Sequence, residues 1–416
     1  MEQNETAEPN NNVHKTKIII IGGGMAGLSA AYHLTKNGVT DYKILEARGR
    51  IGGRIVQIPI GNEKVELGAN WIHGVLGNPV YELAMQHGLV DIMACPKPHK
   101  IVAATEQGKQ VPFATLHEIY EAYLCFLKRC EEYFISQYLP LRESTVSETI
   151  LKPLRKVIPK DNLLVNHPVK QIKWNCNKKS TKDDSDSDDS DRTVIESPST
   201  SRESSCEKVL SRHNVEVICD NDKKFIGDHV ICTLPLGVLK HKVNNIFQPP
   251  LPDYKLEAID RLLFGTVDKI LLEYERPFLH PNITEVLLLW EPEMEKNDDI
   301  SKNWYKKIYS FAKITETLIL GWISGKEAEY METLSNDIII ETCTTILRKF
   351  LNDPFIPKPK SCACTSWYSQ QYTRGSYTAI AVGSSQLDIE YLAQPLYLDE
   401  NESKVRTGDI YLLKSI

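Results

Sequence analysis

The stretch Lys17-Ile18-Ile19-Ile20-Ile21-Gly22-Gly23-Gly24-Met25-Ala26-Gly27 decides the fold. Its first half is an apolar, β-branched run, which is typical of a buried strand. Residues 25–36 then show the apolar spacing of a helix, and residues 41–46 return to a strand pattern. The connections are short, as in a strand–helix–strand unit. We therefore expect an α/β protein that begins with such a unit.

The glycines of this stretch have the spacing G-x-G-x-x-G, between the predicted strand and helix. Gly22 permits a tight turn, Gly24 lets the backbone approach a pyrophosphate, and Gly27 lets the helix pack closely on the strand. Glu46 ends the next strand, where an acidic side chain can accept hydrogen bonds from a ribose. The pattern predicts a dinucleotide site at the helix N-terminus, and a glycine-rich turn without a ligand is the alternative.

The residues after Glu46 favour FAD over NAD. Gly52-Gly53-Arg54 adds a second glycine pair and a guanidinium group that can neutralise pyrophosphate charge. A simple NAD dehydrogenase does not need this second phosphate-facing element. The run Gly68-Ala69-Asn70-Trp71-Ile72-His73-Gly74 then offers small residues beside an aromatic ring, which suits close approach to a flat cofactor ring.

Composition narrows the function further. The chain has 416 residues, of which 42% are hydrophobic and 25% charged, so two or three domains with large cores are expected. The net charge of -6 argues against nucleic acid and is compatible with a cationic ligand. We find no apolar run of the ~20 residues that a spanning helix needs, and no targeting segment, and therefore expect no membrane contact. A cytoplasmic location is expected, ahead of a peroxisomal or nuclear one.

The cysteine pattern predicts reduced thiols and no metal site. Ten cysteines are scattered along the chain, and the only close pair is Cys362-Ala363-Cys364. No second pair or nearby histidine completes a zinc set.

Further periodic segments indicate a second sheet. A long amphipathic helix is expected at residues 116–138, with an apolar stripe that includes Ile119, Tyr120, Tyr123 and Leu124. The chain around residues 177–206 is rich in Ser and Asp, which predicts a disordered loop between two strands. The other predicted elements are strands at 169–174, 215–219, 229–234, 267–274 and 318–323, and helices at 253–263 and 337–351.

Taken together, these motifs resemble the flavin-containing amine oxidases, in particular the polyamine oxidase branch (spermine oxidase and N1-acetylpolyamine oxidase). Besides the glycine motifs, the resemblance rests on the run 71–74, the run 233–239, Phe264-Gly265-Thr266-Val267-Asp268-Lys269, and Trp367 with the run 374–377. It implies a Rossmann-like FAD-binding domain with a mixed-sheet substrate domain. Histone demethylases and membrane monoamine oxidases fit less well, because neither extra helical modules nor an apolar C-terminal tail is evident.

The resemblance also implies a domain order. The expected segments are a disordered N-terminus (1–15), an FAD-binding βαβ segment (16–80), a shortened helical part of the substrate domain (81–160), the return of the FAD-binding domain (161–250), the substrate-domain sheet and helices (251–361), and a partial, truncated C-terminal FAD-binding segment (362–416).

Roles for individual residues follow from the same resemblance. His73 matches a histidine near the substrate amine, and Lys269 matches a lysine that holds a water near flavin N5. The alternatives are a locally bonded loop histidine and a surface lysine. The expected FAD contacts are Gly22, Gly24, Ala26, Gly27, Glu46, Arg54, Asn70, Trp71 and Val169, with Trp367, Tyr372 and Tyr377 as aromatics near the flavin.

The implied reaction is oxidation of a secondary amine in spermine, spermidine or an N1-acetylated polyamine. The products are an imine that hydrolyses to an amine and an aldehyde, and hydrogen peroxide from molecular oxygen. Two parts of the family pattern are not found: a Gly-Glu-x-Thr-like segment near the C-terminus, and a helical region between residues 139 and 154. The alternatives are therefore a truncated, impaired form that acts as a scaffold or regulator, or another flavin amine oxidase. The oligomeric state is not predicted.

Overall fold

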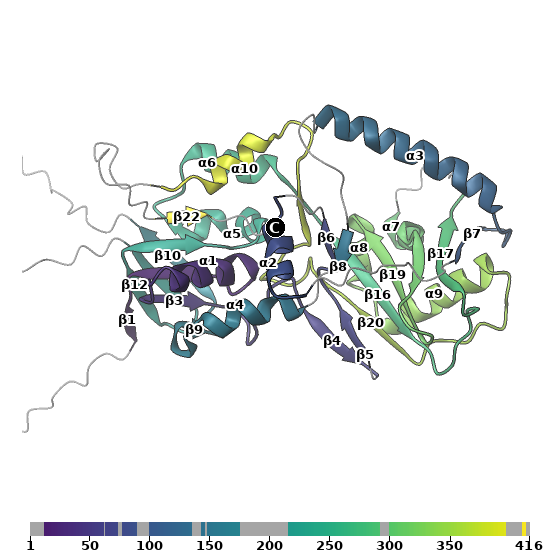
Figure 1. Ribbon diagram of the computed structural model, residues 1–416, viewed down its shortest axis with the longest axis horizontal. Helices are drawn as coiled ribbons and strands as arrows, with labels where there is room; N and C mark the ends of the chain where they lie inside the picture. Colours follow the sequence, from purple (N-terminus) through teal and green to yellow (C-terminus); the bar gives the residue numbers. More distant parts are fainter. Residues whose placement is uncertain are drawn as a thin grey trace, which may run out of the picture.

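The computed structural model describes residues 12–61, 63–73, 77–89, 100–134, 143–145, 148–174, 215–291, 299–396 and 410–412. Two halves lie side by side along the long axis of the molecule, each built around its own sheets (Figure 1). The predicted disordered loop at 177–206 lies outside the described residues.

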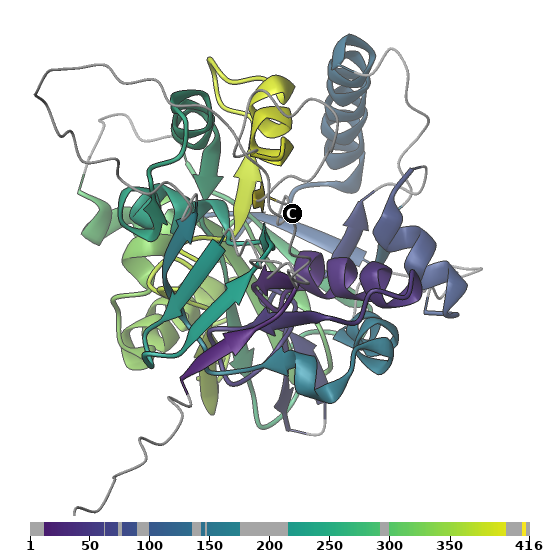
Figure 2. The same cartoon turned by 90° about the vertical axis from the view of Figure 1, so that its left-hand side faces the viewer.

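The first half, which we call the nucleotide half, contains a parallel sheet in the order β22-β13-β2-β3-β9. All four residues of β2 are buried, because β2 lies between β13 and β3 in the centre of the sheet. Helix α1 follows β2 directly, so the predicted strand–helix–strand unit is confirmed. Figure 2 views this half with the sheet and α1 toward the reader. The bounds are β2 (Ile18–Ile21), α1 (Met25–Lys36), β3 (Tyr42–Leu45), β9 (Leu163–Leu164), β13 (His229–Cys232) and β22 (Ile410–Leu412).

A second sheet of the nucleotide half has the order β1-β12-β11-β10-β14. Strands β10 and β11 pair antiparallel, as expected for strands that flank a loop. The expected disorder of residues 1–15 is wrong for 13–15, which form β1, parallel to β12. His14 stacks on Phe225 with ring centroids 5.0 Å apart, a long-range contact that local composition does not reveal. The bounds are β1 (Val13–Lys15), β10 (Val169–Trp174), β11 (Val215–Cys219), β12 (Lys224–Gly227) and β14 (Phe247–Gln248).

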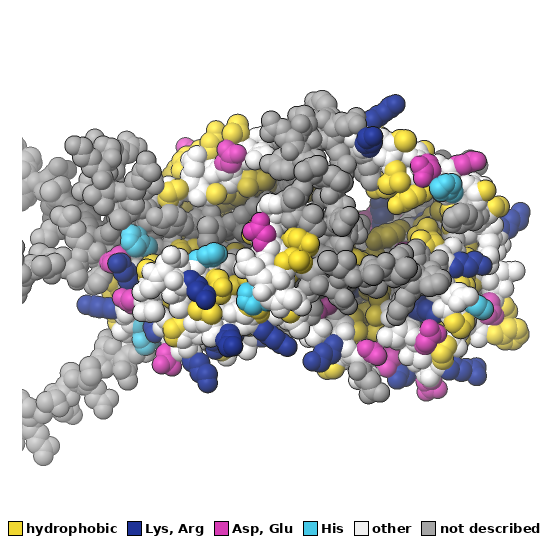
Figure 3. Space-filling view, in the orientation of Figure 1, with side chains coloured by type: hydrophobic (Ala, Val, Ile, Leu, Met, Phe, Trp, Pro, Cys, Tyr) yellow, Lys and Arg dark blue, Asp and Glu magenta, His cyan; other side chains and the backbone are white. Residues whose placement is uncertain are grey.

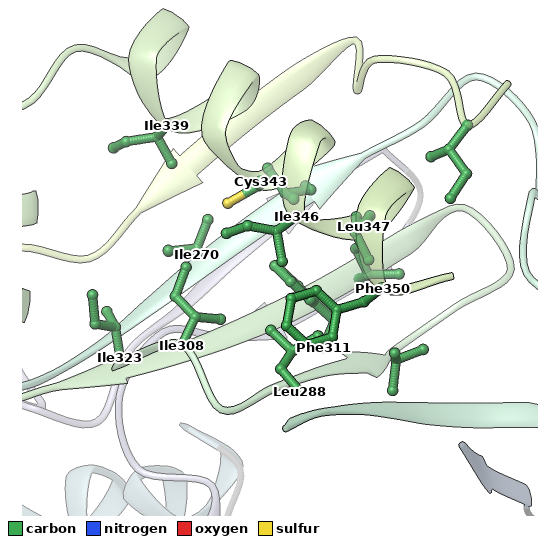
Figure 4. Close-up of a cluster of buried hydrophobic side chains, with 14 of the residues drawn as sticks. Ile270, Leu288, Ile308, Phe311, Ile323, Ile339, Cys343, Ile346, Leu347 and Phe350 are labelled. Carbon is green, nitrogen blue, oxygen red and sulfur yellow. The ribbon is translucent and has the colours of Figure 1, made fainter. Parts of the chain in front are cut away.

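The second half, which we call the sheet half, contains a six-stranded mixed sheet in the order β20-β16-β19-β18-β17-β7. Helix α9 covers one face of this sheet, and Ile346, Leu347 and Phe350 pack against apolar strand residues such as Ile270 and Phe311 (Figure 4). The bounds are β7 (Lys100–Thr105), β16 (Val267–Glu273), β17 (Ile283–Leu289), β18 (Ser310–Lys313), β19 (Leu318–Ser324), β20 (Ser361–Cys364), α7 (Ile300–Asn303), α8 (Lys326–Met331) and α9 (Asn336–Phe350).

Helix α6 (Asp253–Arg261) corrects the expected domain boundary. The sequence interpretation placed it in the substrate-domain segment 251–361, but Ile259 and Leu262 pack into the core of the nucleotide half. Arg261 forms a 2.7 Å ion pair with Asp388 of α10 (Gln386–Ala393), which ties the two helices together. Helical spacing shows which side chains are buried but does not show against which sheet they pack. The other helices are α2 (Pro79–Gln86), α4 (Leu151–Val157) and α5 (Leu236–Ile246).

Helix α3 (Phe113–Phe134) confirms the predicted long helix as far as residue 134, and residues 135–138 lie outside the described part of the chain. Four residues of its apolar stripe, Ile119, Tyr120, Tyr123 and Leu124, are exposed. The helix lies along the outer edge of the molecule (Figure 1). Neither α3 nor any other helix in the described ranges is both long and apolar enough to cross a membrane.

Three two-stranded sheets complete the described fold: β4–β5, β6–β8 and β15–β21. On the face shown in Figure 3, acidic and basic side chains of the described residues are interspersed rather than gathered by sign. The bounds are β4 (Gln57–Ile60), β5 (Glu63–Glu66), β6 (Trp71–His73), β8 (Glu143–Thr145), β15 (Leu263–Gly265) and β21 (Tyr377–Ala379).

Candidate functional site

The glycine-rich turn between β2 and α1 has the geometry that its sequence predicts. Gly22 has φ +103°, a conformation that favours glycine. A Cβ on Gly27 would lie 1.9 Å from the carbonyl oxygen of Gly22, so a side chain there is excluded. Gly24 is the N-cap of α1 and has no side chain to occupy the first amides of the helix. These amides are therefore available to an anion at the helix N-terminus.

The second glycine pair lies opposite the first. The amide of Gly52 donates to the carbonyl oxygen of Gly23 at 2.9 Å, and Gly52 forms an isolated bridge with Gly24. A Cβ on Gly24 would have only the Cα of Gly53 within 4 Å, at 3.9 Å. The space beside Gly24 is thus open, and a side chain there would fill a place where a ligand can approach the backbone.

Glu46 is buried at the end of β3, and its carboxylate holds two backbone segments. Its Oε2 accepts from the amide of Gly23 at 2.7 Å, and its Oε1 accepts from the amide of Arg48 at 2.9 Å. A carboxylate has about four lone-pair positions, so acceptor capacity remains for a ribose hydroxyl.

These features surround one cavity of about 620 Å³, within the ~300–1,000 Å³ range typical of ligand and cofactor sites. The predicted site residues that line it are Gly22, Gly24, Ala26, Glu46, Arg54, Trp71, Val169 and Tyr372. A glycine-lined backbone, a helix N-terminus, a carboxylate and a guanidinium group fit the phosphate and ribose parts of a dinucleotide. The residues present therefore fit the predicted cofactor at this end.

Arg54 lies where the two halves of the molecule meet. Its Nη1 donates to the carbonyl oxygen of Ser376 at 2.6 Å, and its guanidinium group lies 5.7 Å from the ring centre of Phe264. Burial lowers the pKa of Arg54 to about 10, so the group remains a cation at neutral pH. A buried cation beside the cavity favours an anionic ligand.

Lys269 is also buried, with 2% of its surface exposed, which excludes the surface-lysine alternative. Strand β16 is covered on both faces, and its side chains alternate between them. Ile270 and Leu272 pack on the α9 side, whereas Leu271 packs against Val65 on the β4–β5 side. By this alternation Lys269 points toward the β4–β5 side.

The Lys269 ammonium group is held by the loop that follows β5. Its Nζ donates to the carbonyl oxygens of Glu66 and Gly68, each at 2.7 Å, and to Oδ1 of Asn70. It also lies 4.9 Å from the ring centre of Trp322. Burial lowers the pKa of Lys269 to about 7, partly offset by Glu66, so small changes in its surroundings alter its charge near neutrality.

The loop after β5 connects this lysine to the cavity. Ala69 and Trp71 line the cavity, whereas Asn70, between them, binds Lys269. Gly68 allows the close packing, because a Cβ there would lie 1.6 Å from the carbonyl oxygen of Arg54 and 3.4 Å from the Trp367 ring. Lys269 itself is not among the residues that line the cavity.

The remaining predicted residues are placed as follows. Trp367 is buried against Gly68, and Tyr377 is half-exposed in β21; neither lines the cavity. Gly27 acts through packing of α1 rather than as a lining residue. His73 ends β6, where its backbone pairs with Glu143 of β8, and its side chain lies outside what the structure describes.

The roles of two residues of the site were not predicted from the sequence. Thr233 follows β13 and donates from its hydroxyl to the carbonyl oxygen of Ile21 at 2.7 Å, which closes the wall beside Gly22. Trp322 flanks Lys269 from β19, and only the antiparallel register of β16 and β19 brings these two residues together. The sequence run that begins at Thr233 could have indicated the role of Thr233, whereas nothing in the sequence around Trp322 indicated its contact with Lys269.

Within the described ranges, no three or more His, Cys, Asp or Glu side chains are grouped so that they could hold an ion. The sulfur atoms of Cys362 and Cys364 lie 3.6 Å apart on β20 without a disulfide.

Comparisons with known proteins agree with this geometry. The family described as "Flavin containing amine oxidoreductase" matches residues 25–147 and 129–405. The bovine (Bos taurus) peroxisomal N(1)-acetyl-spermine/spermidine oxidase is 29% identical, over 92% of this chain and 87% of that protein. Polyamine oxidase 1 of Oryza sativa subsp. japonica is 27% identical over 92% of this chain and 88% of its own length.

Solved structures show the same fold. A putrescine oxidase bound to putrescine superposes with a TM-score of 0.61 at 16% identity, over 96% of this chain and 93% of that one. The match supports the two-domain α/β architecture expected from the sequence. The absence of two segments of the family pattern stays a prediction. The family match extends over most of the chain, and the site is built around a glycine-rich dinucleotide cavity. The chain therefore belongs to the flavin-containing amine oxidoreductase family.

Proposed function

We propose that this protein is an FAD-dependent polyamine oxidase that oxidises a secondary amine of spermine, spermidine or an N1-acetylated polyamine. The relatives named above act, by their names, on acetylated polyamines or polyamines. The observation that carries the proposal is the buried Lys269 ammonium group, held by the same loop that lines the dinucleotide cavity.

The residues that would hold FAD fall into two groups. The amides of α1, Glu46 and Arg54 would bind its pyrophosphate and ribose, and Val169 would meet the adenine end. Bound FAD supplies the two-electron oxidation of the carbon next to the amine and passes the electrons to oxygen, which gives hydrogen peroxide.

The chain itself contributes a positioned cation and a protected wall. Lys269 donates to the carbonyl oxygen of Gly68, and the Trp367 ring lies beside Gly68. Both side chains are buried, so bulk water is excluded from this part of the wall. With a pKa lowered to about 7, Lys269 can hold or release a proton near neutral pH, which suits a lysine that orients a water molecule. We place His73 on the amine side as a proposal, because its backbone follows Trp71 in β6.

The experiment is to purify the full chain, record its flavin absorbance, and measure hydrogen peroxide formation with N1-acetylspermine, spermine and putrescine. Putrescine has only primary amines and is the matched control. We expect flavin bands, and peroxide with a polyamine that contains a secondary amine. Flavin bands with peroxide only from putrescine would show another flavin amine oxidase. Absence of both flavin and peroxide would favour the non-enzymatic alternative.

A further inference from the structure

Asp268, the neighbour of Lys269 in β16, is fully buried and has no role in the mechanism above. Strand alternation directs it away from Lys269, toward the side of the sheet covered by α8 and α9. Its Oδ1 accepts from the hydroxyl of Thr365 at 2.7 Å and from the amide of Trp367 at 3.2 Å. Its Oδ2 has no hydrogen-bond donor within the described ranges.

A second carboxyl group faces Asp268. The carboxyl group of Glu332, at the C-cap of α8, lies close enough to that of Asp268 to raise its pKa. The Glu332 oxygens also accept from the amides of Tyr368 at 2.8 Å and Ser369 at 2.7 Å. Asp268 is fully buried and Glu332 is half-buried. Two ionised carboxylates this close repel each other, and neither can donate a hydrogen bond. One proton between them removes the repulsion and gives Oδ2 its missing partner.

Both carboxyl groups hold the same segment of chain. Asp268 binds Thr365 and Trp367, and Glu332 binds the next two amides, so residues 365–369 are fixed at both ends. Thr365 is also bonded to the backbone of Lys269 in both directions: the Lys269 amide donates to its hydroxyl at 2.8 Å, and its own amide donates to the Lys269 carbonyl oxygen at 3.0 Å.

We propose that Asp268 and Glu332 share one proton and act together as positioning residues, which hold residues 365–369, including Trp367, against the strand that carries Lys269. The catalytic meaning of this inference rests on the proposed function, but the shared proton does not.

Other titratable groups near the pair do not supply this proton at neutral pH. Cys364 on β20 interacts electrostatically with Asp268, and its thiol neighbour Cys362, together with burial, raises the pKa of Cys364, so this thiol stays neutral. Glu329 on α8 is engaged by the hydroxyl of Thr266 at 3.2 Å. From the neighbouring strand β19, the residue paired with Asp268 is the apolar Ile323.

The shared proton has a defined pH signature. Burial and the contact with Glu332 raise the pKa of Asp268 from 3.8 to about 8. The folded state then carries one proton more than the unfolded state between about pH 4 and pH 8. The stabilisation that this pair contributes is fully present below about pH 4 and is lost as the pH rises toward 8. Over this range the folding equilibrium constant falls about tenfold per pH unit.

The test compares Asp268→Asn with the unsubstituted full chain by denaturant unfolding at pH 5, 6 and 7. Asparagine keeps an acceptor for Thr365 and Trp367 and supplies a permanent N–H donor toward Glu332. The ratio of the two folding constants should therefore change by about tenfold per pH unit in favour of Asp268→Asn. Asp388→Asn is the control, because hydrogen bonds from Ser385 and Arg261 lower the pKa of Asp388, and its ratio should stay constant. A constant ratio for Asp268→Asn would overturn the shared proton.

The positioning role is tested by Asp268→Ala against Asp268→Asn, with Glu332→Gln as a second route if the alanine variant does not fold. We expect acrylamide quenching of the Trp367 signal, obtained by difference from Trp367→Phe, to increase in Asp268→Ala and not in Asp268→Asn. Amine-dependent flavin reduction should fall at least about tenfold only in the alanine variant. Equal quenching in both variants would refute positioning. Absence of turnover in the unsubstituted chain would instead refute the proposed function and leave the pH test decisive for the shared proton.

Discussion

Replacing Lys269 by methionine removes a buried ammonium group and keeps most of the volume of the side chain. The difference between the ordinary pKa of 10.5 and the value of about 7 in the folded chain corresponds to roughly 5 kcal/mol, which is the free energy that burial costs the charged form. The substitution relieves this cost. It also leaves the carbonyl oxygens of Glu66 and Gly68 and the Oδ1 of Asn70 without their donor, at about 1–3 kcal/mol each.

Below pH 7, the relieved cost of burying the charge and the cost of the lost hydrogen bonds are of similar size. The informative quantity is therefore the pH dependence of the stability difference between Lys269→Met and the unsubstituted chain. Between pH 7 and 10.5 the unfolded state carries one proton more at this lysine than the folded state, so the stability of the unsubstituted chain rises with pH. This contribution is present above pH 10.5 and is lost as pH falls through 7. Lys269→Met lacks it, and its deficit should therefore grow by about 2 kcal/mol between pH 7 and pH 9.

The assay is denaturant unfolding at both pH values, combined with stopped-flow measurement of flavin reduction by the amine and reoxidation by oxygen. Lys255→Met is a matched control. Lys255 is fully buried, burial lowers its pKa to about 8, and its Nζ donates to the carbonyl oxygens of Tyr391, Leu392 and Gln394. Both variants should show the pH-dependent deficit, and only Lys269→Met should slow flavin reduction or reoxidation, with FAD still bound.

A deficit of Lys269→Met that is the same at pH 7 and pH 9 would refute the argument from burial. Slower flavin reduction in Lys255→Met, to the same extent as in Lys269→Met, would refute the special position of Lys269 and indicate a general effect of losing a buried lysine.

Two further substitutions test the dinucleotide site. Gly27→Ala places a Cβ 1.9 Å from the Gly22 carbonyl oxygen and should destabilise the chain by about 1–3 kcal/mol or more. Gly265→Ala is the control, because a Cβ there meets nothing within 4 Å, and it should change stability by no more than about 0.5 kcal/mol. Equal midpoints of the two variants in denaturant unfolding would contradict this prediction. Glu46→Ala should weaken FAD retention more than Glu66→Ala, because Glu46 lines the cavity and Glu66 does not, and equal flavin content after gel filtration would count against the ribose assignment.

The parts of the structure that follow from local patterns were predicted well from the sequence. The strand–helix–strand unit depends on a continuous apolar run, a helical repeat and three glycines whose spacing has steric causes, and all of these lie within about thirty consecutive residues. Strand β16 was predicted for a similar reason. Because it is buried on both faces, however, its apolar run could not show toward which face Lys269 points.

The parts that the sequence did not predict depend on contacts between distant segments. Strand β1 is stabilised by its ladder to β12, more than two hundred residues away, and α6 joins the nucleotide half through α10. The side chains of Lys269 and Asn70 meet across 199 positions of sequence. Likewise, the apolar stripe of α3 has helical periodicity, but periodicity alone does not show whether a partner covers it.

The loop after β5 explains why the dinucleotide site and the lysine site form one unit although they belong to different halves of the chain. Gly68 lies against the Arg54 carbonyl oxygen so closely that only glycine fits, and its own carbonyl oxygen accepts from Lys269. Any displacement of this loop therefore moves a wall of the cavity, through Ala69 and Trp71, together with the acceptors of a buried ammonium group. Since an ammonium group buried without its acceptors is costly, the lysine in turn holds the loop in the position that shapes the cavity. The same contact that buries Lys269 thus fixes the wall of the cavity that Ala69 and Trp71 form.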